Sequence, residues 1–185
     1  AKGFLSMEGQ QEALAGGIVQ TAAGAPVMAM DLANADGGLL SRVPPDFSIV
    51  EVANPQALEN FRKVFVETYQ IPEWAGQAWV DATTSFGIGH SPWRMFVGYL
   101  EGEAVATNML FCGAGVASVY AVATLPKAQH RGIGAAITLK PLLDARDAGY
   151  RYAVLFSTEE GFPVYRRLGF EDAGTRLNRY LWRAE

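Results

Sequence analysis

The stretch "AQHRGIGAAI" (residues 128–137) places two glycines one residue apart, between a strand-like segment and a helical one. The first turn of a helix leaves backbone N–H groups without partners, and the helix dipole adds partial positive charge there. Because Gly132 and Gly134 carry no side chain, an anion can approach these amides closely. The stretch therefore predicts a phosphate site, with His130 and Arg131 adding charge from the side.

Three kinds of phosphate loop differ in their sequence patterns. A Walker A loop ends in Gly-Lys-Ser/Thr, which this stretch lacks. A dinucleotide fingerprint needs a third Gly or Ala where this chain has Ile137, and Glu159 lies beyond the usual ~20 residues for a ribose ligand. The third pattern, Gln/Arg-x-x-Gly-x-Gly/Ala, matches in full over residues 129–134.

A second motif, "VYRRLGF" (residues 164–170), follows about 30 residues after the loop. With both motifs, in this order, the chain resembles the GNAT acetyltransferase superfamily over about residues 47–183. The resemblance implies that the loop binds acetyl-coenzyme A through Gln129, His130, Arg131, Gly132, Ile133, Gly134 and Ala135. It also implies that the preceding strand lines the pantetheine arm with Val122, Ala123 and Thr124.

The resemblance gives Tyr165 the role of general acid, because it aligns with the tyrosine of the family's second motif. A phenol with a pKa near 10 stays protonated at pH 7 and donates to a leaving thiolate. Backbone N–H groups of the preceding strand would stabilise charge on the carbonyl oxygen. The implied reaction moves an acetyl group from acetyl-CoA to a primary amine by direct attack in a ternary complex, without a metal. The alternative for Tyr165 is a core tyrosine packed beside Phe170.

Neither motif identifies the base that would deprotonate the amine. Glu159 and Glu160 follow the fifth strand of the expected domain and are candidates, together with water, but a solvated pair of loop carboxylates is the alternative. The family often has Asn and Ala where this chain has Thr158 and Gly161, so a cofactor contact from Thr158 is not part of the prediction.

The acceptor, a small-molecule or peptide amine, is expected near an apolar or aromatic wall that includes Trp74, Trp79 and Trp93. Tyr120 lies two residues before Val122 and so on the same strand face, where it touches substrate or packs in the core. His90 is expected in a loop bordering this region. We interpret Cys112 as a small buried hydrophobe, not as an acyl carrier.

Hydrophobic periodicity predicts an α+β (mixed α/β) domain with a central twisted, mostly antiparallel sheet flanked by helices. The expected strands cover residues 26–32, 47–53, three segments of 94–126, 150–157 and 176–183. The expected helices cover residues 8–16, 55–69, 73–85, 132–148 with a kink at Pro141, and 162–169.

Two domain-level segments are expected. Residues 47–185 form the GNAT-like domain, and residues 1–46 form an N-terminal extension and linker. The extension is either the remnant of a preceding GNAT-like half in a tandem protein or a front strand that packs on the sheet. Since an unpaired strand is a liability, a homodimer that covers it is a further expectation.

Composition narrows the classes of partner. The net charge of −4 and the absence of a Lys/Arg block argue against nucleic acid and anionic membranes as partners. A single cysteine allows no intrachain disulfide and suits the cytoplasm. Two other readings stay open: a non-catalytic acyl-CoA-binding module or structural half of a larger protein, and a nucleotide-binding α/β domain that leaves the second motif unexplained.

Overall fold

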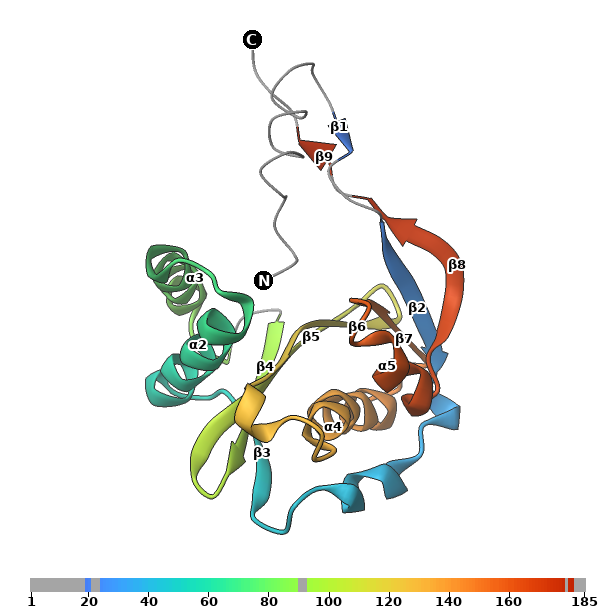
Figure 1. The fold of residues 1–185 in the computed structure, drawn as a ribbon, viewed down its shortest axis with the longest axis horizontal. Helices are drawn as coiled ribbons and strands as arrows, with labels where there is room; N and C mark the ends of the chain where they lie inside the picture. Colours follow the sequence, from blue (N-terminus) through green and yellow to red (C-terminus); the bar gives the residue numbers. More distant parts are fainter. Residues whose placement is uncertain (1–18, 21–23, 90–92, 179, 182–185) are drawn as a thin grey trace.

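The computed structural model describes residues 19–20, 24–89, 93–178 and 180–181, built around a seven-stranded sheet (Figure 1). The strand order is β3-β4-β5-β6-β7-β2-β8, and every neighbouring pair is antiparallel except β6 and β7. The strands are β2 (Ala25–Asp31), β3 (Phe47–Glu51), β4 (Trp93–Leu100), β5 (Glu103–Gly113), β6 (Val116–Thr124), β7 (Tyr152–Phe156) and β8 (Glu171–Leu177). The predicted α+β class with a mostly antiparallel sheet is confirmed.

Helices cover both faces of this sheet. On one face lie α2 (Pro55–Tyr69) and α3 (Glu73–Phe86), with α2 packed on β4, β5 and β6. On the other face lies α4 (Ile133–Asp147), with α5 (Phe162–Leu168) beside it. These positions agree closely with the helices that periodicity predicted after residue 54. Pro141 lies buried inside α4, and the kink expected there stays a prediction.

Local signals account for the start and position of α2. The side chain of Asn54 accepts a hydrogen bond from the N–H of Ala57 at 2.9 Å, and Pro55 follows in the first turn, where its missing N–H costs nothing. Leu58 and Phe61 then fall on the buried face of the helix. Trp79 of α3 stacks on Phe61 with ring centroids 5.1 Å apart, so the two helices share one apolar layer.

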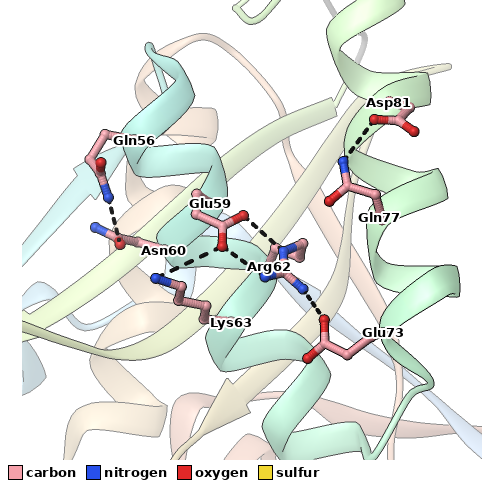
Figure 2. Close-up of polar contacts among 8 residues, drawn as sticks. All are labelled: Gln56, Glu59, Asn60, Arg62, Lys63, Glu73, Gln77 and Asp81. Carbon is pink, nitrogen blue, oxygen red and sulfur yellow. Dashed lines mark hydrogen bonds and ion pairs between the residues drawn. The ribbon is translucent and has the colours of Figure 1, made fainter.

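Arg62 ties α2 to α3 on their polar side (Figure 2). Its guanidinium donates to both carboxylate oxygens of Glu59, at 2.8 and 2.7 Å, and a third nitrogen pairs with Glu73 of α3. Lys63 adds a longer ion pair to Glu59 at 3.8 Å. The bidentate pair with Glu59 lies within α2 and orients the guanidinium, whose side chain is only 13% exposed. The single pair with Glu73, whose side chain is 77% exposed, is the contact of this network that joins α2 to α3.

Strand β2 inserts into the sheet between β7 and β8, although it precedes all the other strands of that sheet in sequence (Figure 1). It pairs antiparallel with both neighbours, for example Met28 with Leu155 and with Asp172. The strand that sequence analysis assigned to the N-terminal extension is thus an interior strand of the same sheet.

The predicted last strand, residues 176–183, is wrong in its bounds. Strand β8 begins earlier, at Glu171, and ends at Leu177, whereas Tyr180–Leu181 forms a separate short strand, β9. β9 pairs with β1 (Val19–Gln20) outside the main sheet. The start of β8 could not be seen in the sequence, because every residue of this edge strand is exposed and no alternating apolar face marks it.

The segment expected as a linker forms short 3-10 turns around the α4 side of the sheet, η1 (Leu32–Asn34) and η2 (Gly37–Arg42). Asp31 and Asp36 cap them by accepting hydrogen bonds from the N–H groups of Ala33 and Gly38. The helix expected over residues 8–16 lies outside the described residues. Within the described part of the chain, no helix is long and apolar enough to span a membrane.

Candidate active site

Strands β6 and β7 are paired only over the first part of β6 and then separate. Their parallel register runs from Val116↔Tyr152 to Val119↔Leu155 and stops there, although β6 continues to Thr124. Residues 120–124 therefore have no strand partner on their β7 side among the described residues. We call this place the divergence. It leaves backbone N–H groups of a central strand available to a ligand.

A β-bulge lies at the divergence. Thr107 pairs with Ala123 and Met109 with Tyr120, so Ala121 and Val122 together face the single residue Asn108 of β5. Ala121 takes the left-handed conformation with φ 49°, which an alanine adopts only under local constraint. The bulge turns the chain of β6 at the point where it leaves β7.

The amides of β6 face alternate neighbours beyond the bulge. The N–H of Leu125 donates to the carbonyl of Val105 in β5 at 2.9 Å. Because N–H and C=O of one residue in an antiparallel ladder point to the same side, Ala123 also faces β5, whereas Val122 and Thr124 face the divergence. In agreement, the Thr124 carbonyl accepts a hydrogen bond from Gln129 Nε2 at 3.0 Å.

The glycine loop lies between the end of β6 and the start of α4. Gly132 precedes α4 with φ 78°, and a Cβ there would meet the carbonyl oxygen of Arg42 at 2.9 Å. No side chain caps the first turn of α4, so its amides have no side-chain acceptor. A Cβ on Gly134 would meet only the hydroxyl oxygen of Thr124, at 3.4 Å. The loop thus brings the helix N-terminus beside the divergence.

The predicted loop residues divide by exposure. Gln129, His130 and Arg131 are exposed, and His130 is in the left-handed region with φ 59°. Ile133 is buried in the core, with only 1% of the residue exposed. Ala135 is half-buried. The side chain of Ala123, from the strand set, packs with Val64 and Leu125 under α2.

Tyr165 lies in α5, buried against the core, with its ring edge toward Phe170 at a centroid distance of 6.0 Å. The structure shows the core packing of Tyr165, and its role as general acid stays a prediction. Gly161 leaves room for the ring, because a Cβ there would meet Tyr165 Cε2 at 2.9 Å. Burial, and after it the nearby Tyr69 hydroxyl, raises the pKa of Tyr165 above its ordinary value near 10. Tyr165 is therefore a neutral hydrogen-bond donor at pH 7.

The residues before α5 form its cap. The hydroxyl of Thr158 accepts a hydrogen bond from the Gly161 N–H at 3.1 Å, and its carbonyl accepts one from Phe162. The hydroxyl of Thr158 is thus engaged in the turn. Glu159 and Glu160 are exposed in the same turn, and their carboxylates form no hydrogen bond or ion pair with a described residue. Their role as a base stays a prediction.

An aromatic cluster lies on the α2 face of the sheet at the divergence. Tyr120 meets Trp93 edge-on at 5.0 Å between ring centroids, and Phe156 follows at 6.3 Å. Phe111 packs on Trp93 at 4.9 Å. Phe156, the last residue of β7, is 38% exposed. These rings, here called the aromatic cluster, are half-buried at the mouth of the divergence.

The other aromatic and sulfur residues of the sequence analysis lie elsewhere. Trp79 belongs to the core between α2 and α3, and Trp74 is 75% exposed on α3. His90 lies outside the described residues. Cys112 is half-buried near the end of β5, and burial raises the pKa of its thiol, so it is no activated nucleophile.

Sequence reasoning missed Tyr69 and Thr107. The Tyr69 hydroxyl donates to the Val122 carbonyl at 2.9 Å, and the Thr107 hydroxyl donates to the Ala121 carbonyl at 2.9 Å. Each of these hydrogen bonds joins segments that are far apart in the chain, and no local sequence pattern predicts such a contact. The only feature that points to these two hydrogen bonds is the bulge in the structure, where two carbonyls of β6 are without ladder partners.

Comparison with known proteins identifies the fold. No model of a protein family matches the sequence. Mycothiol acetyltransferase of Saccharomonospora viridis is 32% identical over 102 residues, which cover 54% of this chain and 33% of that protein. This chain therefore spans about a third of the curated relative.

Two solved structures resemble the chain along most of its length. A GCN5-related N-acetyltransferase from Kribbella flavida matches with a TM-score of 0.64 and 21% identity, covering 84% of this chain and 56% of that one. Another, from Sphaerobacter thermophilus, matches with a TM-score of 0.66 and 18% identity, covering 95% of this chain and 55% of that one. The chain spans just over half the length of each.

Proposed function

We propose, from the premise that this chain has the GNAT fold, that it is an acetyl-CoA-dependent N-acetyltransferase that acetylates a primary amine by direct attack in a ternary complex. The observation that carries the proposal is the divergence of β6 and β7 beside the uncapped N-terminus of α4. Tyr165, the tyrosine of the second motif, is taken as the acid. A strand edge, an anion site and a neutral acid are the three elements that acetyl transfer from a thioester needs.

The residues present fit acetyl-CoA as cosubstrate. The first amides of α4 have no side-chain cap and suit a pyrophosphate, with His130 and Arg131 exposed beside them. The backbone of Val122 and Thr124 faces the divergence and suits the amide-bearing pantetheine arm. Acetyl-CoA would supply an acetyl group activated as a thioester.

The chemistry then assigns roles to this chain's own groups. The acceptor nitrogen forms the new C–N bond, the thioester C–S bond breaks, one proton leaves the nitrogen, and one reaches the thiol sulfur. Backbone N–H groups of β6 stabilise charge on the carbonyl oxygen. Tyr165, kept neutral by its burial, donates the proton from Oη. Glu159, Glu160 or a water takes the proton from the amine.

The aromatic cluster supports an acceptor with an apolar or ring-bearing body. Trp93, Tyr120 and Phe156 present ring surface on the α2 face, next to the divergence. Such rings hold flat or apolar groups and attract cationic amines. A small-molecule amine and the N-terminus of a peptide both meet this description.

Thermal shift with acetyl-CoA, CoA, NAD and ATP tests the ligand. A ligand at a hundred times its Kd stabilises the folded state by about 2.7 kcal/mol, a rise in Tm of about 5–10 °C for a chain of this size. We expect this rise with acetyl-CoA and CoA alone. A rise with NAD or ATP instead would contradict the proposal, and binding without thiol release from any amine would leave a non-catalytic acyl-CoA module.

Substitution of Tyr165 tests the acid. Tyr165→Phe keeps the ring in the core but removes the proton donor, so we expect kcat to fall about 10²-fold while acetyl-CoA affinity stays nearly unchanged. Tyr150→Phe is the control, because Tyr150 packs against the same core. Thiol release with a panel of primary amines gives the rates, and unchanged turnover in Tyr165→Phe would remove Tyr165 from the mechanism.

A further inference from the structure

Tyr69, the last residue of α2, reaches from its helix to the bulge of β6. Its hydroxyl donates to the Val122 carbonyl at 2.9 Å, and its ring leans on Phe65 of the same helix at 4.9 Å between centroids. The residue as a whole is 38% exposed, but its hydroxyl is turned inward to the strand, and this burial raises the pKa of Tyr69. The hydroxyl therefore stays protonated and donating at neutral pH.

Val122 lies between two peptide planes, and a side chain holds each of them. The plane between Ala121 and Val122 contains two polar groups, the Ala121 carbonyl and the Val122 N–H. The Ala121 carbonyl accepts a hydrogen bond from the Thr107 hydroxyl. The next plane contains the Val122 carbonyl, which accepts from Tyr69. Because a peptide unit is rigid, the bond from Thr107 sets the direction of the Val122 N–H, which lies in the same plane as the Ala121 carbonyl. Tyr69 holds the adjoining plane, so rotation about the backbone bonds of Val122 is restrained on both sides.

This arrangement replaces the strand pairing that the bulge removes. The left-handed φ of 49° at Ala121 is unfavourable for a residue with a Cβ, so surrounding contacts must maintain it. Both contacts described above come from the α2 face, from Thr107 of β5 and Tyr69 of α2. Through its pair with Glu73, Arg62 joins α2, the helix that carries Tyr69, to α3 (Figure 2).

We propose that Tyr69 is a positioning residue of the acetyl-transfer site: together with Thr107 it aims the Val122 N–H at the acetyl carbonyl oxygen of the donor. The proposal rests on the proposed function. A hydrogen bond from the Tyr69 hydroxyl also polarises the peptide that follows Val122, which strengthens the remaining hydrogen bonds of that strand.

Tyr69→Phe tests this role without removing the ring that packs on Phe65. The carbonyl band of bound [1-13C]acetyl-CoA, measured by infrared difference spectroscopy, reports the hydrogen bond to the acetyl oxygen. We expect the band to move toward its position in free acetyl-CoA, and kcat to fall about two- to tenfold, as expected for one hydrogen bond. The Kd of CoA, which has no acetyl group, should stay within about twofold of wild type. Thr107→Val acts on the neighbouring plane and should move the band in the same direction.

Tyr99→Phe is the matched control. Tyr99 also joins α2 to the sheet, since its hydroxyl accepts a hydrogen bond from Asn60 Nδ2 at 3.0 Å, but it lies away from the bulge. A purely structural effect of losing a tyrosine hydroxyl would therefore appear in this variant too, whereas the proposal predicts an unchanged band. A wild-type band and wild-type kcat in Tyr69→Phe would overturn the role of Tyr69 alone. Failure of the wild-type protein to bind CoA and acetyl-CoA would overturn the proposed function, and the role of Tyr69 with it.

Discussion

At Gly161, one hydrogen atom in place of a methyl group leaves the space that the Tyr165 ring occupies. A Cβ there would lie 2.9 Å from Tyr165 Cε2, closer than nonbonded carbons approach, while the backbone at φ −75° and ψ −29° suits any residue. We expect Gly161→Ala to displace the ring and lower kcat about tenfold to a hundredfold, with CoA affinity retained.

Gly37→Ala controls for the added methyl group, because a Cβ there meets Leu143 Cδ1 at an ordinary 3.5 Å. Steady-state thiol release and calorimetric titration with CoA separate turnover from binding. Equal kcat values for Gly161→Ala and wild type would mean that the position of the Tyr165 ring does not limit the reaction.

Gly132 and Gly134, in the loop and first turn of α4, have different structural roles. Gly132 has φ 78° and faces the Arg42 carbonyl, so Gly132→Ala should lower the free energy of unfolding by about 1–2 kcal/mol. Gly134 lies within the first turn of α4, where alanine is favoured over glycine by up to about 1 kcal/mol. Gly134→Ala should therefore leave stability unchanged or raised and keep CoA affinity near that of wild type, because the Gly-x-Gly/Ala pattern accepts alanine here. Gly134→Glu places a carboxylate beside the same amides and should weaken CoA binding about tenfold or more.

Urea denaturation and CoA titration of the glycine variants give the two quantities independently. The proposed anion site requires that CoA affinity falls in Gly134→Glu while Gly134→Ala stays near wild type. Wild-type CoA affinity in Gly134→Glu would argue that the loop serves only as a turn.

At the scale of the whole molecule, burial of tyrosine hydroxyls makes the folded state sensitive to alkaline pH. Burial raises the pKa of Tyr165 and of Tyr69 above their ordinary value near 10. The folded protein then keeps these protons where the unfolded chain loses them, so the stabilisation is complete below about pH 10 and declines as the pH rises further.

We expect the free energy of unfolding to fall above about pH 10 by up to about 1.4 kcal/mol per pH unit for each such tyrosine. Tyr165→Phe should have a shallower decline, because it has one group fewer to titrate. Urea denaturation from pH 8 to pH 11 measures both slopes. Identical slopes in the variant and the wild type would show that Tyr165 does not contribute to the alkaline response.

Much of the candidate site was predictable because its motifs are local. The loop over residues 129–134 needs only glycines, a strand before it and a helix after it, and all three lie within one short stretch. Asn54 followed by Pro55 marks the start of α2 for the same reason. The divergence itself has no local signal, since the end of pairing between β6 and β7 depends on two segments that contact across the sheet.

The sequence by itself determined the elements whose causes lie within a few residues: the helices after residue 54, the central strands, the loop and the motif around Tyr165. Tertiary structure alone decided which distant segments meet. It inserted β2 between β7 and β8, because an interior strand there buries Met28 and Met30 against the core. It also brought Tyr69 to Val122, whose carbonyl has no ladder partner after β7 separates from β6 and accepts a hydrogen bond from the Tyr69 hydroxyl instead. Hydrogen-bond satisfaction across the sheet is a property of packing, and no local periodicity encodes it.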